Sequence, residues 1–226
     1  MDHAVIFDFN GVLLDDERIH QALFNEILAP LGYAISAAEY FDRYVGFDDA
    51  DCFRHIVEER GGAIDEAEVV RWIAAKAARY RIRMAHDPPL FPGAVAVVRE
   101  LARHHPLAIC SGALRAEVEG VLAAANLSDC FAAVVVAEDV VHGKPDPEGY
   151  ERALVALKRR TKPALTADHC LVIEDTVAGI AAAKGAGMRC LAVAHTYPVA
   201  RLSGADRIVA TLAEVTPTLV AALFRG

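Results

Sequence analysis

Four short stretches of the sequence place acidic, basic or hydroxyl side chains at the ends of apolar runs of strand-like length or in the loops that follow them. They read FDFNGVLLDD from residue 7, LAICSGALR from 107, HGKPDPEGY from 142 and CLVIEDTVAG from 170. Open parallel sheets place their chemistry at the carboxyl ends of the strands, so these side chains are expected to converge. Together they offer a carboxylate nucleophile, a hydroxyl and an ammonium group for anion binding, and a pair of acids suited to a divalent cation.

The first stretch raises the sharpest chemical question, because an asparagine follows the candidate nucleophile. Asp8 ends an apolar run that begins at Ala4, and Gly11 then marks a sharp turn or the close approach of a ligand to the backbone. The residue at position 10 would be well placed to move a proton for a nucleophilic Asp8. Asn10 cannot do so at neutral pH, since its amide is neither an acid nor a base there. The alternative is a structural Asp8 at a strand end.

A hydroxyl and an ammonium group follow two further strand-like runs. Ser111 precedes Gly112 and a predicted helix, so its hydroxyl and the N–H groups of that helix start suit a phosphate oxygen. An ordinary helix N-cap serine is the alternative. Lys144 lies between a glycine and a proline, and its mobile ammonium suits a doubly charged anion or a carboxylate crowded against one. The alternative is a solvent-exposed loop lysine.

Two adjacent acids end the fourth stretch. Glu174 and Asp175 close a strand-like run, and Thr176 opens a helix. These acids would repel each other unless a cation lies between them and Asp8, and magnesium prefers such hard oxygen ligands and couples carboxylates to phosphate. The alternative is an acidic helix N-terminus favoured by the helix dipole.

The elements that must position these side chains follow an alternating pattern. Strand candidates are residues 4–8, 107–111, 132–136, 169–174, 189–193 and 207–210. Helical patterns separate the later ones, so the fold class is α/β, a Rossmann-like parallel sheet with helices on both faces. A glycine-rich GAG sequence ends the helix that Thr176 opens, as is typical of a helix stop.

One region breaks the alternation and predicts a separate module. Residues 15–88 contain amphipathic helical patterns at 17–30, 37–45, 49–60 and 65–85, and no convincing strand. Two consecutive prolines in HDPPLFPG close this region with an extended linker. We therefore expect residues 1–14 and 89–226 to form the core, and residues 15–88 to form an all-helical cap inserted after the first strand.

Composition excludes several classes of function. The net charge is −8 and no basic patch stands out, which argues against nucleic-acid binding. No apolar stretch reaches membrane-spanning length, and MDHAVIF is a poor secretory signal, so a cytoplasmic location without membrane association is expected. The cysteines show no metal-finger spacing and are expected to be small buried side chains in a reducing compartment. They are Cys52, Cys110, Cys130, Cys170 and Cys190.

Taken together, the four stretches resemble the motifs of the haloacid dehalogenase-like hydrolase superfamily. The matching segments are DFNGV, the SG pair at 111–112, GKPDP and EDTVAGIAAAKGAGM, in the order that the family shows. The resemblance covers essentially the whole chain. It is strongest to the branch with a helical cap after the first strand, which includes β-phosphoglucomutase and phosphoglycolate phosphatase.

This resemblance implies a role for each motif residue. Asp8 would be the nucleophile that forms an aspartyl-phosphate, while Ser111 and Lys144 would hold the transferring phosphoryl group. The backbone carbonyl of Asn10 and the carboxylates of Asp8 and Asp175 would hold Mg²⁺, with Glu174 beside it. The substrate would be a small phosphorylated metabolite, and the enzyme would be a monomer or a homodimer.

The resemblance also implies residues that bind the part of the substrate beyond the phosphate. His20 lies where the first strand's loop joins the cap, and the segment VGFDD at 45–49, which contains Gly46, resembles the cap's substrate loop. Lys76 lies on a predicted cap helix at a position that often faces the active site in the family. A hinge-packing role for His20 and an exposed helix face for Lys76 are the alternatives. Two further predicted contacts in the core are Gly112 and Arg115.

Position 10 is where the sequence departs from the phosphotransferring relatives, which carry an aspartate that protonates the leaving oxygen and then deprotonates the attacking water. Loss of such acid–base help typically costs ~10²–10⁴-fold in rate. Four interpretations are open. The substrate has a good leaving group, such as an acyl phosphate; another group, with His20 the nearest by sequence, moves the proton; the protein binds phosphorylated ligands with little turnover; or the asparagine was introduced by engineering.

Other reactions of the superfamily fit less well. Halide-cleaving members resemble a different pattern without a metal, which the retained pair Glu174 and Asp175 argues against. Phosphonate cleavage would need Lys76 to form a Schiff base with the substrate. A mutase must transfer phosphoryl to two hydroxyls in turn, so Asn10 disfavours a β-phosphoglucomutase activity. The leading expectation is therefore an Mg²⁺-dependent phosphatase, with a phospho-ligand-binding regulatory protein as the rival.

Overall fold

The computed structural model of the 226-residue chain describes residues 3–45, 47, 49–85, 88–161 and 163–225. It divides into two units, each described separately below. The sheet unit comprises Met1–Asp15 and Pro88–Gly226, and the helical unit comprises Asp16–Asp87. The limits of the helical unit differ by one residue at each end from the segment 15–88 expected from the sequence.

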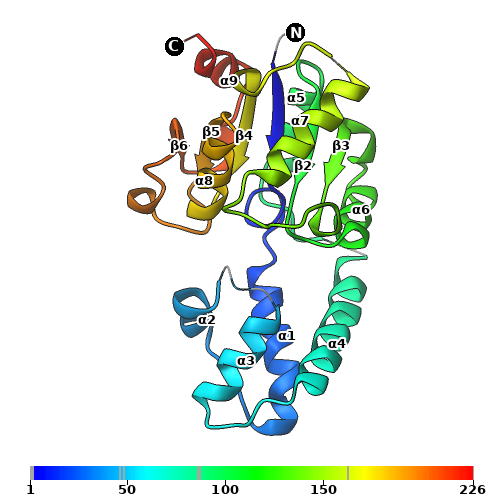
Figure 1. The fold of residues 1–226 in the computed structure, drawn as a ribbon, viewed down its shortest axis with the longest axis vertical. Helices are drawn as coiled ribbons and strands as arrows, with labels where there is room; N and C mark the ends of the chain where they lie inside the picture. Colours follow the sequence, from blue (N-terminus) through cyan, green and yellow to red (C-terminus); the bar gives the residue numbers. More distant parts are fainter. Residues whose placement is uncertain (1–2, 46, 48, 86–87, 162, 226) are drawn as a thin grey trace. The chain divides into compact units, whose positions relative to one another are not determined.

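Among the described residues of the sheet unit, six parallel strands form one sheet, in the order β3-β2-β1-β4-β5-β6 (Figure 1). Their bounds are β1 (Ala4–Phe7), β2 (Leu107–Cys110), β3 (Phe131–Val135), β4 (Cys170–Glu174), β5 (Arg189–Val193) and β6 (Arg207–Val209). All six strands predicted from the sequence are present, and the parallel α/β fold class is confirmed. The order reverses between β1 and β4, which is the point where such sheets bind ligands.

Helices cover both faces of this sheet. Those of the sheet unit are α5 (Ala94–Ala102), α6 (Arg115–Ala124), α7 (Glu148–Arg160), α8 (Val177–Gly185) and α9 (Pro217–Leu223). On one face α7 packs over β2 and β3, and α8 over β4 and β5. The side chains that alternate to the other face, such as Val5 and Phe7 on β1, are fully buried as well. This two-sided burial explains why the central strands read as continuous apolar runs.

The two ends of α8 show why its sequence forms a short, sharply limited helix. The Thr176 side chain accepts a hydrogen bond from the Gly179 N–H, an N-cap worth about 1 kcal/mol. At the other end Gly187 takes a left-handed conformation with φ of 72°. The N–H groups of Gly187 and Met188 then bond back to the carbonyls of Lys184 and Ala183, which ends the helix. The predicted start and stop signals are therefore both confirmed.

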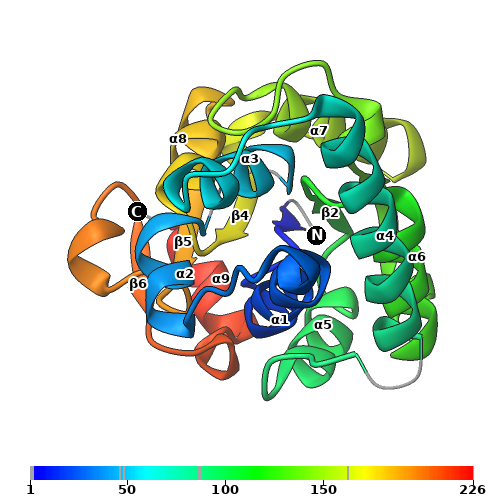
Figure 2. The ribbon, with the colours of Figure 1, turned by 90° about the horizontal axis from the view of Figure 1, so that it is seen from below.

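The described residues of the helical unit form four α-helices, which Figures 1 and 2 label. They are α1 (Glu17–Leu28), α2 (Ala37–Arg43), α3 (Asp49–Glu59) and α4 (Glu66–Met84). Residues such as Phe24, Phe53 and Ile56 form its apolar core, and α4 packs against both α1 and α3. The helices predicted for this region are present, with ends within a few residues of those expected.

Four of the five cysteines are buried, and all five are free thiols. Cys130 is partly exposed. Burial raises the pKa of the Cys110 thiol to about 12, so this group stays protonated at neutral pH. No helix among the described residues is long and apolar enough to cross a bilayer.

Candidate active site

Asp8 lies directly after β1 and opposite the end of β4. Its backbone N–H donates to the carbonyl of Ile173 at 2.9 Å, so the ladder between β1 and β4 continues one residue past the strand and fixes the carboxylate. The side chain is only 10% exposed. A carboxylate held this rigidly at the point of strand-order reversal has the placement expected of a nucleophile.

Lys144 bridges two of these acids from the loop before α7. Its Nζ donates to Asp8 Oδ1 at 2.6 Å and to Glu174 Oε1 at 2.6 Å. Burial alone would lower the pKa of Lys144, but the two carboxylates outweigh it and raise that pKa above its usual value. Lys144 is therefore a permanently charged group, and the alternative of a solvent-exposed loop lysine is wrong.

Glu174 is fully buried, and both of its carboxylate oxygens are occupied by hydrogen bonds. Oε1 accepts from Lys144 and from the hydroxyl of Tyr150 at 2.9 Å. Oε2 accepts from the N–H groups of Asp175 and Thr176 and from the Thr176 hydroxyl, at 2.8, 2.9 and 3.0 Å. Burial alone would raise the pKa of Glu174, but Lys144 and these N–H groups lower it below its usual value. Glu174 is therefore ionised and holds Lys144 in place.

Asp175 differs from Glu174 in having an unused oxygen. Its Oδ2 accepts a hydrogen bond from the Thr196 hydroxyl, while its buried Oδ1 has no hydrogen-bond partner among the described residues. Burial, together with the neighbouring Glu174 and Asp8, raises the pKa of Asp175 well above its usual value. A buried carboxylate oxygen without a partner is costly, which marks it as an atom available to a ligand.

Glycines make room for both acids of this pair. A Cβ at Gly11, whose φ is 75°, would overlap the Asp175 carboxylate. A Cβ at Gly179 would overlap the Glu174 carboxylate in the same way. The glycine that breaks the first motif is therefore required by the close approach of the backbone to Asp175 as well as by its left-handed conformation.

The charges of this cluster do not balance within the described residues. Oxygens of Asp8, Glu174 and Asp175 all lie within 4.8 Å of one another, and one ammonium group, that of Lys144, faces them. Burial raises the pKa of Asp8 to about 7; Lys144 opposes this rise and Glu174 adds to it. An excess of buried negative charge with a free Asp175 oxygen fits a hard divalent cation, which would reverse these shifts.

Ser111 and Asn10 contact each other beside this cluster. The Ser111 hydroxyl donates to Asn10 Oδ1 at 3.4 Å and accepts from the Ala113 N–H at 3.0 Å. The N-cap residue of α6 is Leu114, so the alternative of Ser111 as an ordinary N-cap is wrong. Gly112 faces open space, with no atom within 4 Å of an added Cβ.

Arg115 makes its described side-chain contacts with acidic residues only. Its guanidinium pairs with Asp139 at 2.5 Å and with Glu119 at 3.2 Å, which raises the pKa of Arg115 even though burial opposes it. The side chain is 39% exposed. No described contact joins Arg115 to the carboxylate cluster, so its substrate contact stays a prediction.

The other predicted substrate contacts lie in the helical unit. Lys76 on α4 is 2% exposed, and its Nζ donates to Asp49 Oδ1 at 2.6 Å. The same Nζ lies 2.7 Å from His20 Nδ1. His20 on α1 in turn contacts Asp16 Oδ2 at 3.0 Å, and the Tyr80 hydroxyl donates to the same oxygen at 2.5 Å. The alternative of Lys76 on an exposed helix face is therefore wrong. Gly46 lies outside the described residues.

Three residues at the sheet site were not found from the sequence. Thr196 and His195 lie in the loop after β5, where Thr196 holds Asp175 and His195 Nδ1 lies 3.0 Å from the Gly11 carbonyl. Burial lowers the pKa of His195 below its usual value, so the ring is neutral at neutral pH. Tyr150 is the third. Thr196 and His195 could have been found from the sequence, because they form a polar pair directly after a predicted strand.

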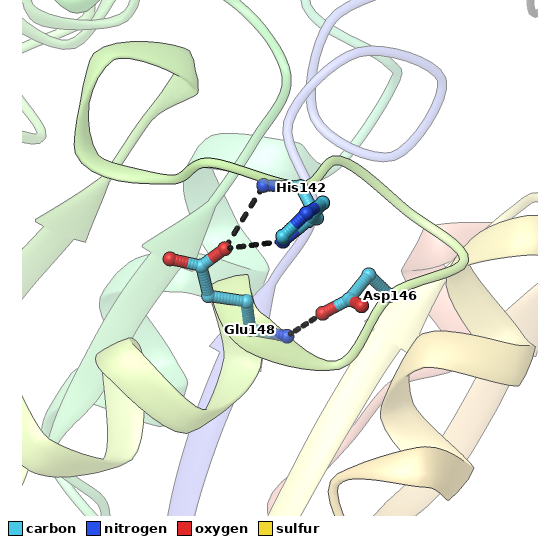
Figure 3. Close-up of side chains that lie close together, drawn as sticks. All are labelled: His142, Asp146 and Glu148. Atoms are coloured by element: carbon cyan, nitrogen blue, oxygen red, sulfur yellow. Dashed lines mark hydrogen bonds and ion pairs between the residues drawn. The ribbon is translucent and has the colours of Figure 1, made fainter.

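A second cluster of possible ligand atoms lies in the loop that carries Lys144. His142, Asp146 and Glu148 approach one another on the surface (Figure 3). Glu148 Oε2 accepts the N–H groups of Val141 and His142 at 3.0 and 2.9 Å, and Asp146 Oδ1 accepts the Glu148 N–H at 2.9 Å. These hydrogen bonds close the loop on itself, so we assign this cluster to loop structure.

A protein-family model described as haloacid dehalogenase-like hydrolase matches residues 3–187 of this chain. The chain belongs to this family. The matched segment contains the first three motifs, the fourth except for its last residue, Met188, and the whole helical unit, and the resemblance found from the sequence is confirmed. The protein is therefore an enzyme of the hydrolase class.

Individual members of the haloacid dehalogenase-like family match along most of the chain. Protein CbbY of Rhodobacter capsulatus is 30% identical over 201 residues, which cover 86% of each chain. Fructose-1-phosphate phosphatase YqaB of Escherichia coli is 31% identical, covering 82% of this chain and 93% of that protein. A crystal structure of CbbY from Rhodobacter sphaeroides, in a mutant with an aspartate replaced by asparagine and in complex with xylulose-(1,5)bisphosphate, has a TM-score of 0.81 and 26% identity, covering 95% and 96% of the two chains.

Proposed function

We propose that this enzyme is an Mg²⁺-dependent phosphatase that hydrolyses a small phosphorylated metabolite, of the sugar phosphate class, through an aspartyl-phosphate on Asp8. The observation that carries the proposal is the buried cluster in which Lys144 bridges Asp8 and Glu174 beside the unpartnered oxygen of Asp175. Such a cluster offers a nucleophile, a fixed positive charge and a cation site within a few ångströms.

The donor set of the cluster fits magnesium. Asp8 and Asp175 would supply carboxylate oxygens and Asn10 its backbone carbonyl, with Glu174 beside them. The two occupied oxygens of Glu174 favour a supporting role for that residue, since its hydrogen bonds already hold Lys144 and the start of α8. When bound, the cation would neutralise the carboxylates and the phosphoryl oxygens, which lets an anionic nucleophile approach an anionic substrate.

The residues of this chain supply the remaining steps. An Asp8 oxygen attacks phosphorus, the bond between phosphorus and the leaving oxygen breaks, and the leaving oxygen takes up a proton. A water molecule then attacks the phosphorus of the acyl phosphate, which releases inorganic phosphate and restores Asp8. Lys144 and the Ser111 hydroxyl would bind the phosphoryl oxygens in both steps.

Asn10 sets the limits of this reaction. Its amide neither donates a proton to the leaving oxygen nor takes one from the water, so a sugar alkoxide would leave slowly. Turnover would stay efficient in two cases. Either the substrate is an acyl phosphate, whose leaving group needs little help from an acid, or His20 supplies the proton. A protein that binds phosphorylated ligands with little turnover is the second candidate function, and Asn10 is the observation that favours it.

The named relatives support the substrate class. One is a fructose-1-phosphate phosphatase, and the CbbY structure holds a sugar bisphosphate. We further propose that the helical unit is the cap that selects the substrate, through the segment around Gly46 and the residues His20 and Lys76. Gly112 and Arg115 stay predicted contacts in the sheet unit. A cytoplasmic location and a monomeric or homodimeric state also stay predictions.

A steady-state assay with Mg²⁺ tests this proposal. It compares the protein with Asn10→Asp on one acyl phosphate and one sugar phosphate, with Asp8→Asn as the inactive control. A gain of ~10²–10⁴-fold on the sugar phosphate would identify position 10 as a missing general acid in a phosphatase site. Failure of both proteins to turn over or to bind any phosphate analogue would overturn the proposal. Saturable Mg²⁺-dependent binding without turnover would support the second candidate function.

A further inference from the structure

The first turn of α7 contacts the Lys144 loop at two independent points. Glu148 begins this helix and Tyr150 follows two residues later, and neither residue belongs to the catalytic cluster described above. Together they touch the loop backbone and the carboxylate that holds the ammonium group.

Glu148 closes the backbone of the loop. Its Oε2 accepts a hydrogen bond from the N–H group of His142, two residues before Lys144 (Figure 3). The same oxygen accepts from the N–H group of Val141, three residues before Lys144. Its Oε1 is held by Arg152, one helical turn further on, with Nε at 2.7 Å. A second bond from the Asp146 N–H to the Gly143 carbonyl at 3.0 Å tightens the turn around the lysine. Because these bonds hold the loop on both sides of Lys144, the start of its side chain is fixed in position.

Tyr150 holds the other end of the same side chain. It is fully buried, and its hydroxyl donates at 2.9 Å to Glu174 Oε1, the oxygen that also accepts from Lys144. The Lys144 Nζ lies 5.2 Å from the centroid of the Tyr150 ring, within reach of a cation–π interaction. A small residue is needed between the two anchors, because a Cβ at Gly149 would lie 2.8 Å from Cys110 Sγ on β2.

From these contacts we infer that the first turn of α7 positions Lys144 at Asp8. Glu148 holds the backbone of the loop. Tyr150 holds Glu174 Oε1, which also accepts from Lys144, and places its ring beside the ammonium group. Both are positioning residues, since neither touches Asp8. The inference deepens the proposed function and rests on it for its catalytic consequence, but the placement of the ammonium group can be measured without any substrate.

Nuclear magnetic resonance of the lysine ammonium groups tests the placement directly. An ammonium group hydrogen-bonded to two carboxylates exchanges its protons slowly, so the protein is expected to show a resolved ¹H–¹⁵N signal that disappears in Lys144→Met. We expect Tyr150→Phe and Glu148→Ala to broaden or shift this signal, while Glu148→Gln, which retains an acceptor oxygen, preserves it. Matched controls are Tyr40→Phe, which removes a buried hydroxyl bonded to Glu17, and Glu151→Ala on the exposed face of the same turn.

Ligand binding then measures the catalytic consequence. Orthovanadate resembles the transition state of phosphoryl transfer, whereas inorganic phosphate resembles the ground state. With Mg²⁺ present, Tyr150→Phe should weaken orthovanadate binding about tenfold, the size of one hydrogen bond to a charged group, with a smaller change for phosphate. A merely structural role would lower the active fraction without changing either dissociation constant.

The outcomes separate the two proposals. An unchanged Lys144 signal in both Tyr150→Phe and Glu148→Ala, or equal changes in the Tyr40→Phe control, would overturn the positioning role whatever the enzyme's activity. A signal lost as expected, in a protein that binds neither orthovanadate nor phosphate, would support the positioning role and contradict the phosphatase.

Discussion

Two lysines, one in each unit of the molecule, have similar partners but different surroundings. Lys144 in the sheet unit and Lys76 in the helical unit each donate a 2.6 Å hydrogen bond to an aspartate, and each lies near an aromatic ring. Lys144 faces three carboxylates whose oxygens lie within a few ångströms, whereas Lys76 contacts Asp49 and the ring of His20.

The two networks differ in how the charge around each lysine is balanced. Around Lys76 and His20, Asp49 and Asp16 supply acceptors within the same unit, so the ammonium group and the imidazole ring both have partners there. Within the part of the chain that the structure describes, the cluster around Lys144 is left with an excess of negative charge, and Asp175 has an oxygen without a hydrogen-bond partner. Buried polar groups that the chain leaves unsatisfied mark the place where a ligand is expected.

The largest expected effect follows from replacing one aspartate of each network. Asp8→Asn removes the nucleophile and should lower turnover of a phosphate ester by at least about 10³-fold. Asp49→Asn keeps the shape of the other network and should lower turnover far less. Steady-state rates with Mg²⁺ measure both. Equal losses in the two variants would contradict the distinction between the clusters.

Replacing the lysines sharpens the same comparison. Lys144→Met should lower kcat by about 10²-fold, because a fixed positive charge at the phosphoryl oxygens is lost. Lys76→Met should act on KM more than on kcat, because Lys76 is predicted to contact the substrate beyond its phosphate. It should also lower the stability of the fold by about 1–2 kcal/mol, since it breaks a pair whose aspartate is 35% exposed and can be solvated in its place. Rates and thermal unfolding curves are compared for each variant. A larger kcat loss in Lys76→Met than in Lys144→Met would reverse the assignment.

The raised pKa of Asp8 predicts that this residue, although required for activity, lowers the stability of the fold when it is ionised. The folded-state pKa of about 7 lies above the usual value of 3.8, so ionisation of Asp8 costs stability as the pH rises through this window. At pH 8 without Mg²⁺, Asp8→Asn should therefore be more stable than the original protein, by about 1–3 kcal/mol. The advantage should vanish below pH 3.8 and shrink when Mg²⁺ is added. Chemical denaturation of both proteins, with and without a chelator, measures this difference in the free energy of unfolding. Equal stabilities of the two proteins at pH 8 without Mg²⁺ would show that repulsion within the cluster does not destabilise the fold.

The smallest effect concerns Glu148, whose pKa is lowered to about 2 from 4.5 by the His142 N–H and the Arg152 side chain. A lowered pKa contributes stability above the usual value, and this contribution is lost as the pH falls from about 4.5 to about 2. Glu148→Gln should therefore flatten the pH dependence of the melting temperature in this window. Glu151→Ala serves as the control in the same helical turn, and parallel curves for the original protein and Glu148→Gln would rule the contribution out.

The sequence was sufficient to predict the elements and the motif residues of the sheet site. Apolar runs of four or five residues alternate with helical patterns, and each polar motif residue follows such a run, so convergence at one edge of a parallel sheet follows from topology alone. The buried acids Asp8, Glu174 and Asp175 and the bridging Lys144 lie where this reasoning places them.

Contacts between distant side chains were not predictable in the same way. Lys76 is 27 residues from Asp49 and 56 from His20, so their pairing depends on how α1, α3 and α4 pack. Tyr150 reads as an ordinary apolar residue of a helix, because nothing in its neighbours shows that its hydroxyl reaches Glu174. The short motif around Ser111 suggested a helix N-cap as one alternative, but the helix begins later, at Arg115.

The most direct test of the central claim, that the buried cluster around Asp8 binds a divalent cation and a phosphoryl group, uses beryllium fluoride as a phosphoryl mimic. ¹⁹F nuclear magnetic resonance of the protein with Mg²⁺ and beryllium fluoride should show bound-fluoride signals that are absent without Mg²⁺ and absent in Asp8→Asn. Lys76→Met should retain them, since Lys76 is predicted to contact the part of the substrate beyond the phosphate, which beryllium fluoride lacks. A wild-type protein that gives no bound signal with Mg²⁺, or signals that persist in Asp8→Asn, would contradict the account.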